Sequence, residues 1–131
     1  MAKILNISEA LTIGIHSMGI ISKSKKPVNA KSIAEITGFS KNHISKILQQ
    51  LAKNDFLVSS RGPSGGYLLK RDAETINLFD IYKLFEGDIR TDYCKHECIN
   101  CPFNKCVFDQ IVENISNQFK EYLIKKKVSQ L

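Results

Sequence analysis

Four cysteines lie close together toward the C-terminal end of the sequence, and their side chains have the clearest capacity for chemistry. They are Cys94, Cys98, Cys101 and Cys106, in the stretch DYCKHECINCPFNKC with the spacing C-x3-C-x2-C-x4-C. In a cytosolic chain, such density favours metal or redox chemistry over a framework of structural disulfides. His96 and Asp109 are candidate auxiliary ligands, although each is more simply a bystander.

Three kinds of chemistry fit this cysteine cluster. Thiolates on one loop can wrap an iron–sulfur cluster, of either the 2Fe–2S or the 4Fe–4S type. Four thiolates also suit tetrahedral zinc, for which the two-residue gap between Cys98 and Cys101 is typical. Alternatively, two of the cysteines form a disulfide on oxidation, as in a thiol switch. The spacing favours the iron–sulfur cluster but leaves all three open.

The charge is distributed unevenly along the chain. The 131 residues contain 19 Lys and Arg against 13 Asp and Glu, a net charge of +6 with a pI near 9.2. Residues 1–70 hold 10 basic and 3 acidic side chains, whereas residues 71–131 hold 9 basic and 10 acidic. A basic N-terminal half beside a near-neutral C-terminal half suggests a unit that binds a polyanion, attached to a second unit.

Apolar spacing and capping residues predict the elements that position these groups. We expect helices over residues 8–21, 30–37 and 41–54, with caps at Ser8, Asn29 and Ser40 and a stop at Gly38. In the second helix we expect Ile33, Ala34 and Ile36 to face inward; in the third, Ile44, Ile47, Leu48 and Leu51. Strands at 56–60 and 67–70 would flank a glycine-bearing hairpin tip.

The C-terminal half is predicted to be helical on both sides of the cysteine loop. Asn77 caps a helix whose inward residues would be Leu78, Ile81, Leu84 and Phe85, ending at Gly87. A last helix over 107–127 carries Ile111, Ile115, Phe119, Tyr122 and Leu123. We therefore predict a mainly α chain with a β-hairpin wing: a winged helix-turn-helix (1–87), a cluster-binding loop (88–106) and a C-terminal dimerisation helix (107–131).

This order of elements points to DNA as the polyanion. A helix in the major groove needs short hydrogen-bonding side chains and cations at its N-terminal end. The candidates there are Ser40, Lys41, Asn42, His43, Ser45 and Lys46. The hairpin tip would lie along the backbone or minor groove, with Arg61 supplying charge and the glycines allowing main-chain N–H groups to approach phosphate. The wing candidates are Arg61, Gly62, Pro63, Ser64, Gly65, Gly66 and Tyr67.

Several other function classes fit the sequence poorly. The N-terminal residues lack a signal-peptide pattern and no apolar stretch nears ~20 residues, so we expect a cytoplasmic protein without a membrane partner. A small thiol oxidoreductase would need a reactive thiol beside a βαβ scaffold, which the pattern does not offer, so we do not expect an enzyme. A plain protein-interaction module would leave the basic half and the wing unexplained.

The sequence resembles the Rrf-two family of winged-helix transcriptional regulators, typified by IscR and NsrR, over nearly its whole length. The most specific match is SSRGPSGGYLL at 59–69, supported by SIAEITGFSKNHISKILQQL at 32–51, by Glu86-Gly87, and by the cysteine loop before a long helix. The resemblance implies a DNA-binding regulator, most simply a repressor, that senses redox state, nitric oxide or iron–sulfur status. It also implies a homodimer, paired through the C-terminal helix, on a pseudo-palindromic duplex operator.

The resemblance further implies an iron–sulfur cluster held by three loop cysteines, for which Cys94, Cys101 and Cys106 align best. Cys98 is additional and could be the fourth ligand. Where some members place a histidine this chain has Asp109, and where others place an N-terminal acid it has Ser8 next to Glu9. These departures keep zinc and a thiol switch as alternatives to the cluster.

Overall fold

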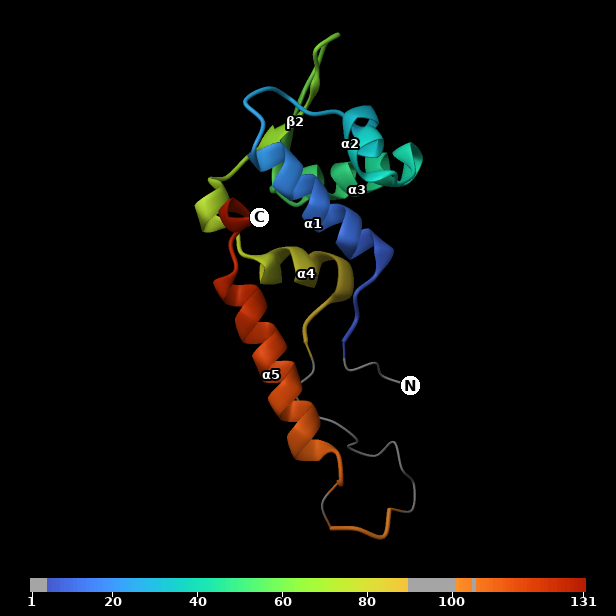
Figure 1. The fold of residues 1–131 in the computed structure, drawn as a ribbon, viewed down its shortest axis with the longest axis vertical. Helices are drawn as coiled ribbons and strands as arrows, with labels where there is room; N and C mark the ends of the chain where they lie inside the picture. The colour runs from blue at the N-terminus through green and yellow to red at the C-terminus, as the bar shows by residue number, and fades with distance from the viewer. Residues whose placement is uncertain (1–4, 90–100, 105) are drawn as a thin grey trace.

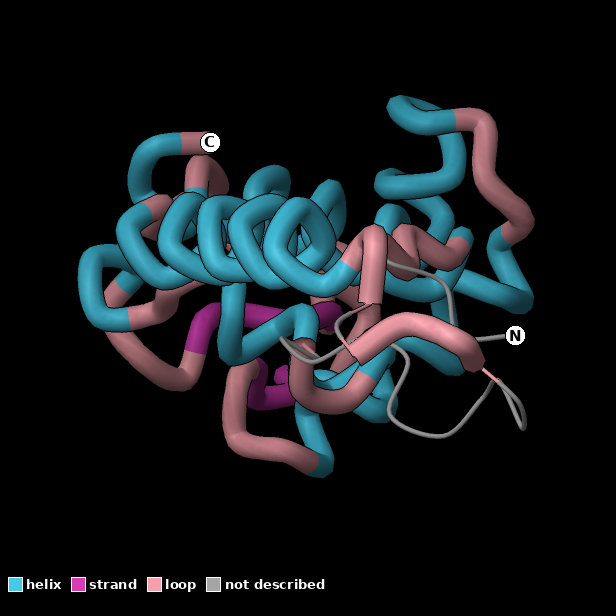
Figure 2. The backbone as a smooth tube through the Cα atoms, turned by 90° about the horizontal axis from the view of Figure 1, so that it is seen from below, coloured by secondary structure: helices cyan, strands magenta, loops and turns pink. Residues whose placement is uncertain are grey.

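The computed structural model describes residues 5–89, 101–104 and 106–131. Its helices are α1 (Glu9–Ser22), α2 (Ala30–Thr37), α3 (Lys41–Lys53), α4 (Leu78–Glu86) and α5 (Asp109–Lys125), with short 3-10 turns η1 (Ala73–Thr75) and η2 (Val128–Gln130). Strands β1 (Leu57–Ser60) and β2 (Gly66–Leu69) follow α3. This order confirms the predicted winged helix-turn-helix with a long C-terminal helix (Figure 1). Figure 2 shows the strands, in magenta, as one small hairpin among the helices.

Side-chain caps start four of the helices where the sequence predicts them. The oxygen atoms of Ser8, Asn29, Ser40 and Asn77 accept hydrogen bonds from backbone N–H groups three residues later, at 2.8–3.4 Å. Each cap satisfies one N–H group that has no partner inside its helix. At the end of α2, Gly38 takes the left-handed conformation, with φ 80°, which turns the chain into α3.

The core forms where α1, α3 and the hairpin meet. The predicted stripe of α3 is confirmed, since Ile44, Ile47, Leu48 and Leu51 are all buried. In α2 the expectation for Ile36 was wrong, because its side chain is 66% exposed. Helix α2 packs inward through Ala30, Ile33 and Ala34, and Ile36 lies outside that face at the helical spacing of 100° per residue.

Helix α4 is more buried than its own sequence pattern predicts. Leu78 and Ile81 are buried as expected, but Leu84 and Phe85 are only partly buried, and Phe79 and Tyr82 are buried instead. The reason is that α5 packs on a second side of α4. There the rings of Tyr82 and Phe119 pack edge to face, with their centroids 5.5 Å apart. Burial raises the pKa of the Tyr82 hydroxyl above its usual value.

Only part of α5 packs on the winged-helix unit, and the helix extends away from it (Figure 1). It is shorter than predicted, beginning at Asp109 and ending at Lys125. The chain becomes extended at Lys126, whose carbonyl accepts the N–H of Leu78, and Val128 N–H donates to the Ile76 carbonyl. Two backbone hydrogen bonds therefore fix the C-terminal end of α5 to the segment that begins α4.

Candidate nucleic-acid interface

The N-terminal end of α3 carries the predicted DNA-reading residues on its outer surface. Lys41, Asn42 and Lys46 are exposed, and the structure gives their side chains no hydrogen bond or ion pair with any described residue. The hydroxyls of Ser40 and Ser45 serve the helix itself: Ser40 accepts the His43 N–H, and Ser45 donates to the Lys41 carbonyl at 2.9 Å. The three longer side chains are therefore the ones available to a ligand.

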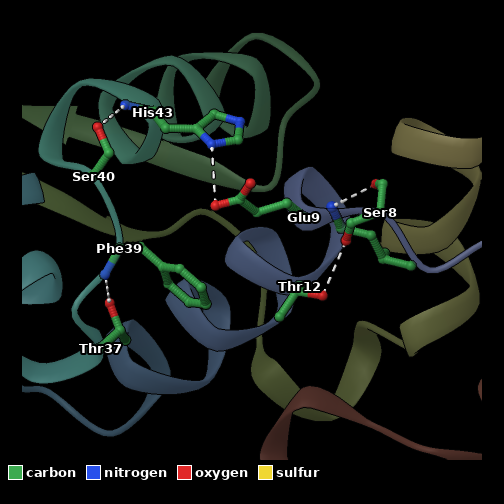
Figure 3. Close-up of polar contacts among 8 residues, drawn as sticks. Ser8, Glu9, Thr12, Thr37, Phe39, Ser40 and His43 are labelled. Atoms are coloured by element: carbon green, nitrogen blue, oxygen red, sulfur yellow. Dashed lines mark hydrogen bonds and ion pairs between the residues drawn. The ribbon is translucent and has the colours of Figure 1, made fainter.

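His43 belongs to a contact that joins α3 to α1. Its Nδ1 lies 3.9 Å from the Glu9 Oε1 at the start of α1 (Figure 3). The neighbouring Ser8 donates its backbone N–H to the Glu86 Oε1, at 3.1 Å, at the end of α4. A short series of contacts thus connects the end of α4, the start of α1 and the reading helix. The hydrogen bond from Ser8 to Glu86 gives no local signal in the sequence, because the two residues are 78 positions apart.

The hairpin tip divides into an exposed part and a part that packs internally. Arg61, Gly62, Pro63 and Ser64 are exposed, and Gly62 has a φ of 108°, which favours glycine. Gly66 instead lies against the backbone of Val28, where an added Cβ would come within 2.6 Å of the carbonyl carbon and oxygen. The predicted close approach of glycine backbone therefore occurs at Gly66, but inside the protein.

The backbone of Tyr67 is fully engaged by the same neighbour. Its N–H donates to the Val28 carbonyl at 2.8 Å, and its carbonyl accepts the Val28 N–H at 3.0 Å. Its ring is partly buried against the core. Of the predicted wing residues, Gly66 and Tyr67 therefore hold the hairpin against Val28, and Gly65 donates its N–H to the Gly62 carbonyl within the tip at 2.9 Å. Residues 61–64 form the surface that a duplex would meet.

The structure places only two of the four cysteines. Cys94 and Cys98 lie outside the described residues, as does His96. The Cys101 thiol is exposed, with its Sγ 3.9 Å from the Phe103 carbonyl oxygen, and Cys106 is partly buried. Among the described residues no three His, Cys, Asp or Glu side chains are close enough to share a metal ion. The donor chemistry of four thiolates close together in the sequence suits iron–sulfur clusters and zinc, and one of these thiols, that of Cys101, is exposed.

Comparison with known proteins decides the family. The profile of the Rrf2 family, described as iron-dependent transcriptional regulators, matches residues 7–131. The chain belongs to the Rrf2 family. It is 33% identical over 88 residues to the regulator NsrR of Bacillus licheniformis, a match that covers 67% of this chain and 59% of that protein. It is 25% identical over 117 residues to IscR of Sodalis glossinidius, covering 89% and 67% respectively.

Solved structures show the same fold. CymR of B. subtilis, described as a global cysteine regulator, superposes with a TM-score of 0.79 at 23% identity, covering 95% of this chain and 94% of that one. IscR of T. potens superposes with a TM-score of 0.75 at 26% identity, covering 95% of this chain and 84% of that one. The oxidised form of Staphylococcus aureus CymR gives 0.74 at 25% identity, covering 95% and 93%.

These findings confirm the resemblance, the fold and the non-enzymatic class of the protein. Members of the family regulate transcription and bind DNA through a winged helix. Within the described part of the chain, none of the helices combines the length and apolar character needed to cross a bilayer. Four points stay predictions: the operator, the oligomeric state, the ligands of the cysteine loop, and the domain boundaries after residues 87 and 106.

Proposed function

We propose that this Rrf2-family chain acts in the cytoplasm as a homodimer that binds a pseudo-palindromic operator and changes its affinity with the chemical state of its cysteine loop. Helix α3 would enter the major groove, where Asn42 can pair with an adenine edge and Lys41 and Lys46 can reach phosphate or guanine. Support comes from the free, exposed side chains of these three residues. Arg61, exposed at the wing, would contact the neighbouring backbone or minor groove.

The second copy of the chain would pack on the outer face of α5. Ile111, Ile115 and Tyr122 recur there at spacings of four and seven residues, so they share one face, and they are 53%, 38% and 59% exposed. Exposed apolar side chains in such a row favour burial against a partner. A twofold pairing of α5 helices would present two reading helices to two operator half-sites, which explains why a palindromic site is expected.

The observation that carries the regulatory part of the proposal is the contact series from α4 to α3. Residues 88–106 begin two positions after Glu86, which accepts the Ser8 N–H, and Ser8 precedes Glu9, which contacts His43. A change that moves the end of α4 therefore acts on both the start of α1 and the reading helix. Coupling between sites of this kind typically amounts to ~1–3 kcal/mol, or about 5–150-fold in affinity.

Cys94, Cys98, Cys101 and Cys106 are the residues that would hold an iron–sulfur cluster, with zinc as the alternative. A bound cluster would supply sensitivity to oxidants, nitric oxide and iron supply through loss of its thiolate ligation. The thiols themselves would order the loop next to Glu86 when ligated. A thiol–disulfide switch is the second candidate, and two observations favour it: Cys101 is exposed, and a relative of similar fold has been solved in an oxidised form.

The decisive experiment begins with duplexes that the anaerobically purified protein selects from a random library. Affinity for the selected duplex is then measured for the protein as purified, after chelation, and after mild oxidation, alongside analysis of iron, sulfide and zinc. We expect the affinity to change at least fivefold between two of these states, and the metal analysis identifies which chemistry is present. Equal affinity in all states would contradict sensing, and the absence of any selected duplex would contradict operator binding.

A variant pair tests the contact series itself. Glu86→Gln should keep the fold, because the amide oxygen can still accept the Ser8 N–H, whereas Glu86→Ala removes that acceptor. We expect Glu86→Ala to reduce the difference in affinity between the loaded and chelated states, with Glu86→Gln close to the wild type. An undiminished difference in Glu86→Ala would show that the signal does not pass through this hydrogen bond.

A further inference from the structure

The loop between α1 and α2 carries a concentrated positive charge that the reading helix and wing do not account for. Residues 22–31 contain four lysines and no acidic residue. Lys25 and Lys26 are both exposed, and the structure gives neither ammonium group an ion pair or hydrogen bond with any described residue. Unpaired cations side by side repel each other, and that cost is offset when they bind an anion.

The backbone holds this loop in a defined position beside the wing. The Ser24 hydroxyl donates to the Lys26 carbonyl at 2.8 Å and accepts the Lys26 N–H at 3.2 Å. Two residues further on, Val28 exchanges both of its backbone hydrogen bonds with Tyr67. The two lysines therefore lie on a turn of fixed conformation, and Val28 joins this turn to Tyr67 of the hairpin by backbone hydrogen bonds.

The arrangement of the elements places this turn at the same end of the molecule as the wing. In Figure 1 the loop from α1 to α2 passes beside the hairpin, at the end opposite to the free portion of α5. The loop then leads into the Asn29 cap of α2, the first helix of the helix-turn-helix. In such motifs the first helix crosses the DNA backbone while the second enters the major groove, so the turn adjoins the path of a phosphate strand.

The two cations at the base of the hairpin, Lys70 and Arg71, are already engaged. Lys70 Nζ lies 2.7 Å from the Asp55 carboxylate, and the Arg71 guanidinium lies 4.5 Å from the Phe56 ring centroid while its Nε donates to the Asp55 carbonyl. Both residues serve to fix the base of the wing. Lys70 and Arg71 are therefore occupied within the protein, whereas Lys25 and Lys26 in the adjacent loop are available to an anion.

We propose that Lys25 and Lys26 form a second backbone clamp, contacting DNA phosphates outside the segment read by α3 and the wing. The clamp rests on the proposed operator binding and extends it. Because phosphates carry no sequence information, these contacts raise affinity for every duplex equally and widen the footprint without altering which bases are preferred. Each contact releases counterions, so the clamp also contributes to the salt dependence of binding.

The test measures fluorescence anisotropy of the full-length protein with a selected duplex and with a scrambled duplex of the same length, across a range of salt concentrations. The double substitution Lys25→Ala with Lys26→Ala should make the slope of log K against log salt less negative by about 1.8 per protomer, at about 0.9 per phosphate contact. Both duplexes should lose the same fold in affinity. The pair Lys25→Arg with Lys26→Arg keeps the charge and should retain the wild-type slope.

A matched control removes an adjacent lysine pair elsewhere in the chain. Lys125→Ala with Lys126→Ala deletes the same charge at the end of α5 and should leave the slope unchanged. A wild-type slope in the Lys25 and Lys26 alanine pair would overturn the clamp while leaving operator binding intact, as would a loss confined to the selected duplex. If the wild-type protein prefers no duplex over its scrambled form, operator binding itself fails; if it binds neither duplex, the clamp fails as well.

Discussion

The winged-helix unit and the C-terminal helix differ in two respects: whether their helices are capped by side chains, and how much of their apolar surface is buried. Helices α1 to α4 begin with side-chain caps, and their apolar stripes meet in one core. Helix α5 begins at Asp109 with Phe108 at the N-cap position and no side-chain cap, and most of its large apolar side chains are exposed. The winged-helix unit has its own core within a single chain, whereas α5 leaves apolar side chains exposed that the proposed dimer would cover.

The largest effect is expected from a substitution in the core of the winged-helix unit, which lowers its stability. Leu48→Ala removes a fully buried side chain from α3 and should lower the free energy of unfolding by about 2–5 kcal/mol, because transfer and cavity costs add. Ile36→Ala, at the exposed surface of α2, is the control and should change it by less than about 0.5 kcal/mol. Urea titration followed by circular dichroism measures both; similar costs for the two would contradict the assigned core.

The next effect concerns the contact between the hairpin and the loop. Gly66→Ala places a methyl group against the Val28 backbone, and the resulting overpacking should cost about 1–3 kcal/mol of stability. Because it displaces the wing from the loop, DNA affinity should fall as well. In Gly62→Ala the added Cβ has no neighbouring atom within 4 Å. This substitution should lower the stability only through the positive φ of residue 62, by about 1 kcal/mol. Thermal unfolding of the two variants separates packing from backbone strain, and a loss of stability in Gly66→Ala no larger than in Gly62→Ala would argue against a packing role for Gly66.

A smaller effect is expected at the outer face of α5, where the proposed dimer would form. Ile115→Ala on the outer face of α5 should leave the stability of the folded chain almost unchanged but weaken dimerisation by roughly tenfold, or about 1.4 kcal/mol. Sedimentation equilibrium over a range of protein concentrations measures the dissociation constant. Asn114→Ala, at a neighbouring exposed residue of the same helix, is the control and should leave the dissociation constant unchanged. A dimer unaffected by Ile115→Ala would place the interface elsewhere.

The smallest effect depends on pH at the base of the wing. The hydrogen bond and charge of Lys70 lower the pKa of the Asp55 carboxyl below its usual value. The ionised form is therefore favoured by folding, and its contribution is present at neutral pH and lost as the pH falls through the lowered pKa. Asp55→Asn keeps a residue that tolerates the φ of 67° seen there. Its melting temperature should lie slightly below that of the wild type at pH 7, and the gap should close in acid.

Local patterns predicted the helices and strands of the winged-helix unit but not the contacts between residues far apart in the sequence. Caps such as Ser40 and the α3 stripe follow from residues a few positions apart, so sequence reasoning found them. The burial of Phe79 and Tyr82 depends on α5, and the hydrogen bond from Ser8 to Glu86 joins residues 78 positions apart. Gly66 could be recognised as special from the sequence, but its neighbour Val28 could not, because the pairing arises only in the folded chain.

The hydrogen bonds that attach the end of α5 to the start of α4 have a consequence for the geometry of the operator. Since Lys126 and Val128 bond directly to Leu78 and Ile76, the C-terminal end of α5 is held firmly to the winged-helix unit. In the proposed dimer the two half-sites would then have to match in helical phase as well as in sequence. Adding one base pair at the centre of the operator turns one half-site by about 35°, a twist that such a stiffly joined pair of subunits would not follow.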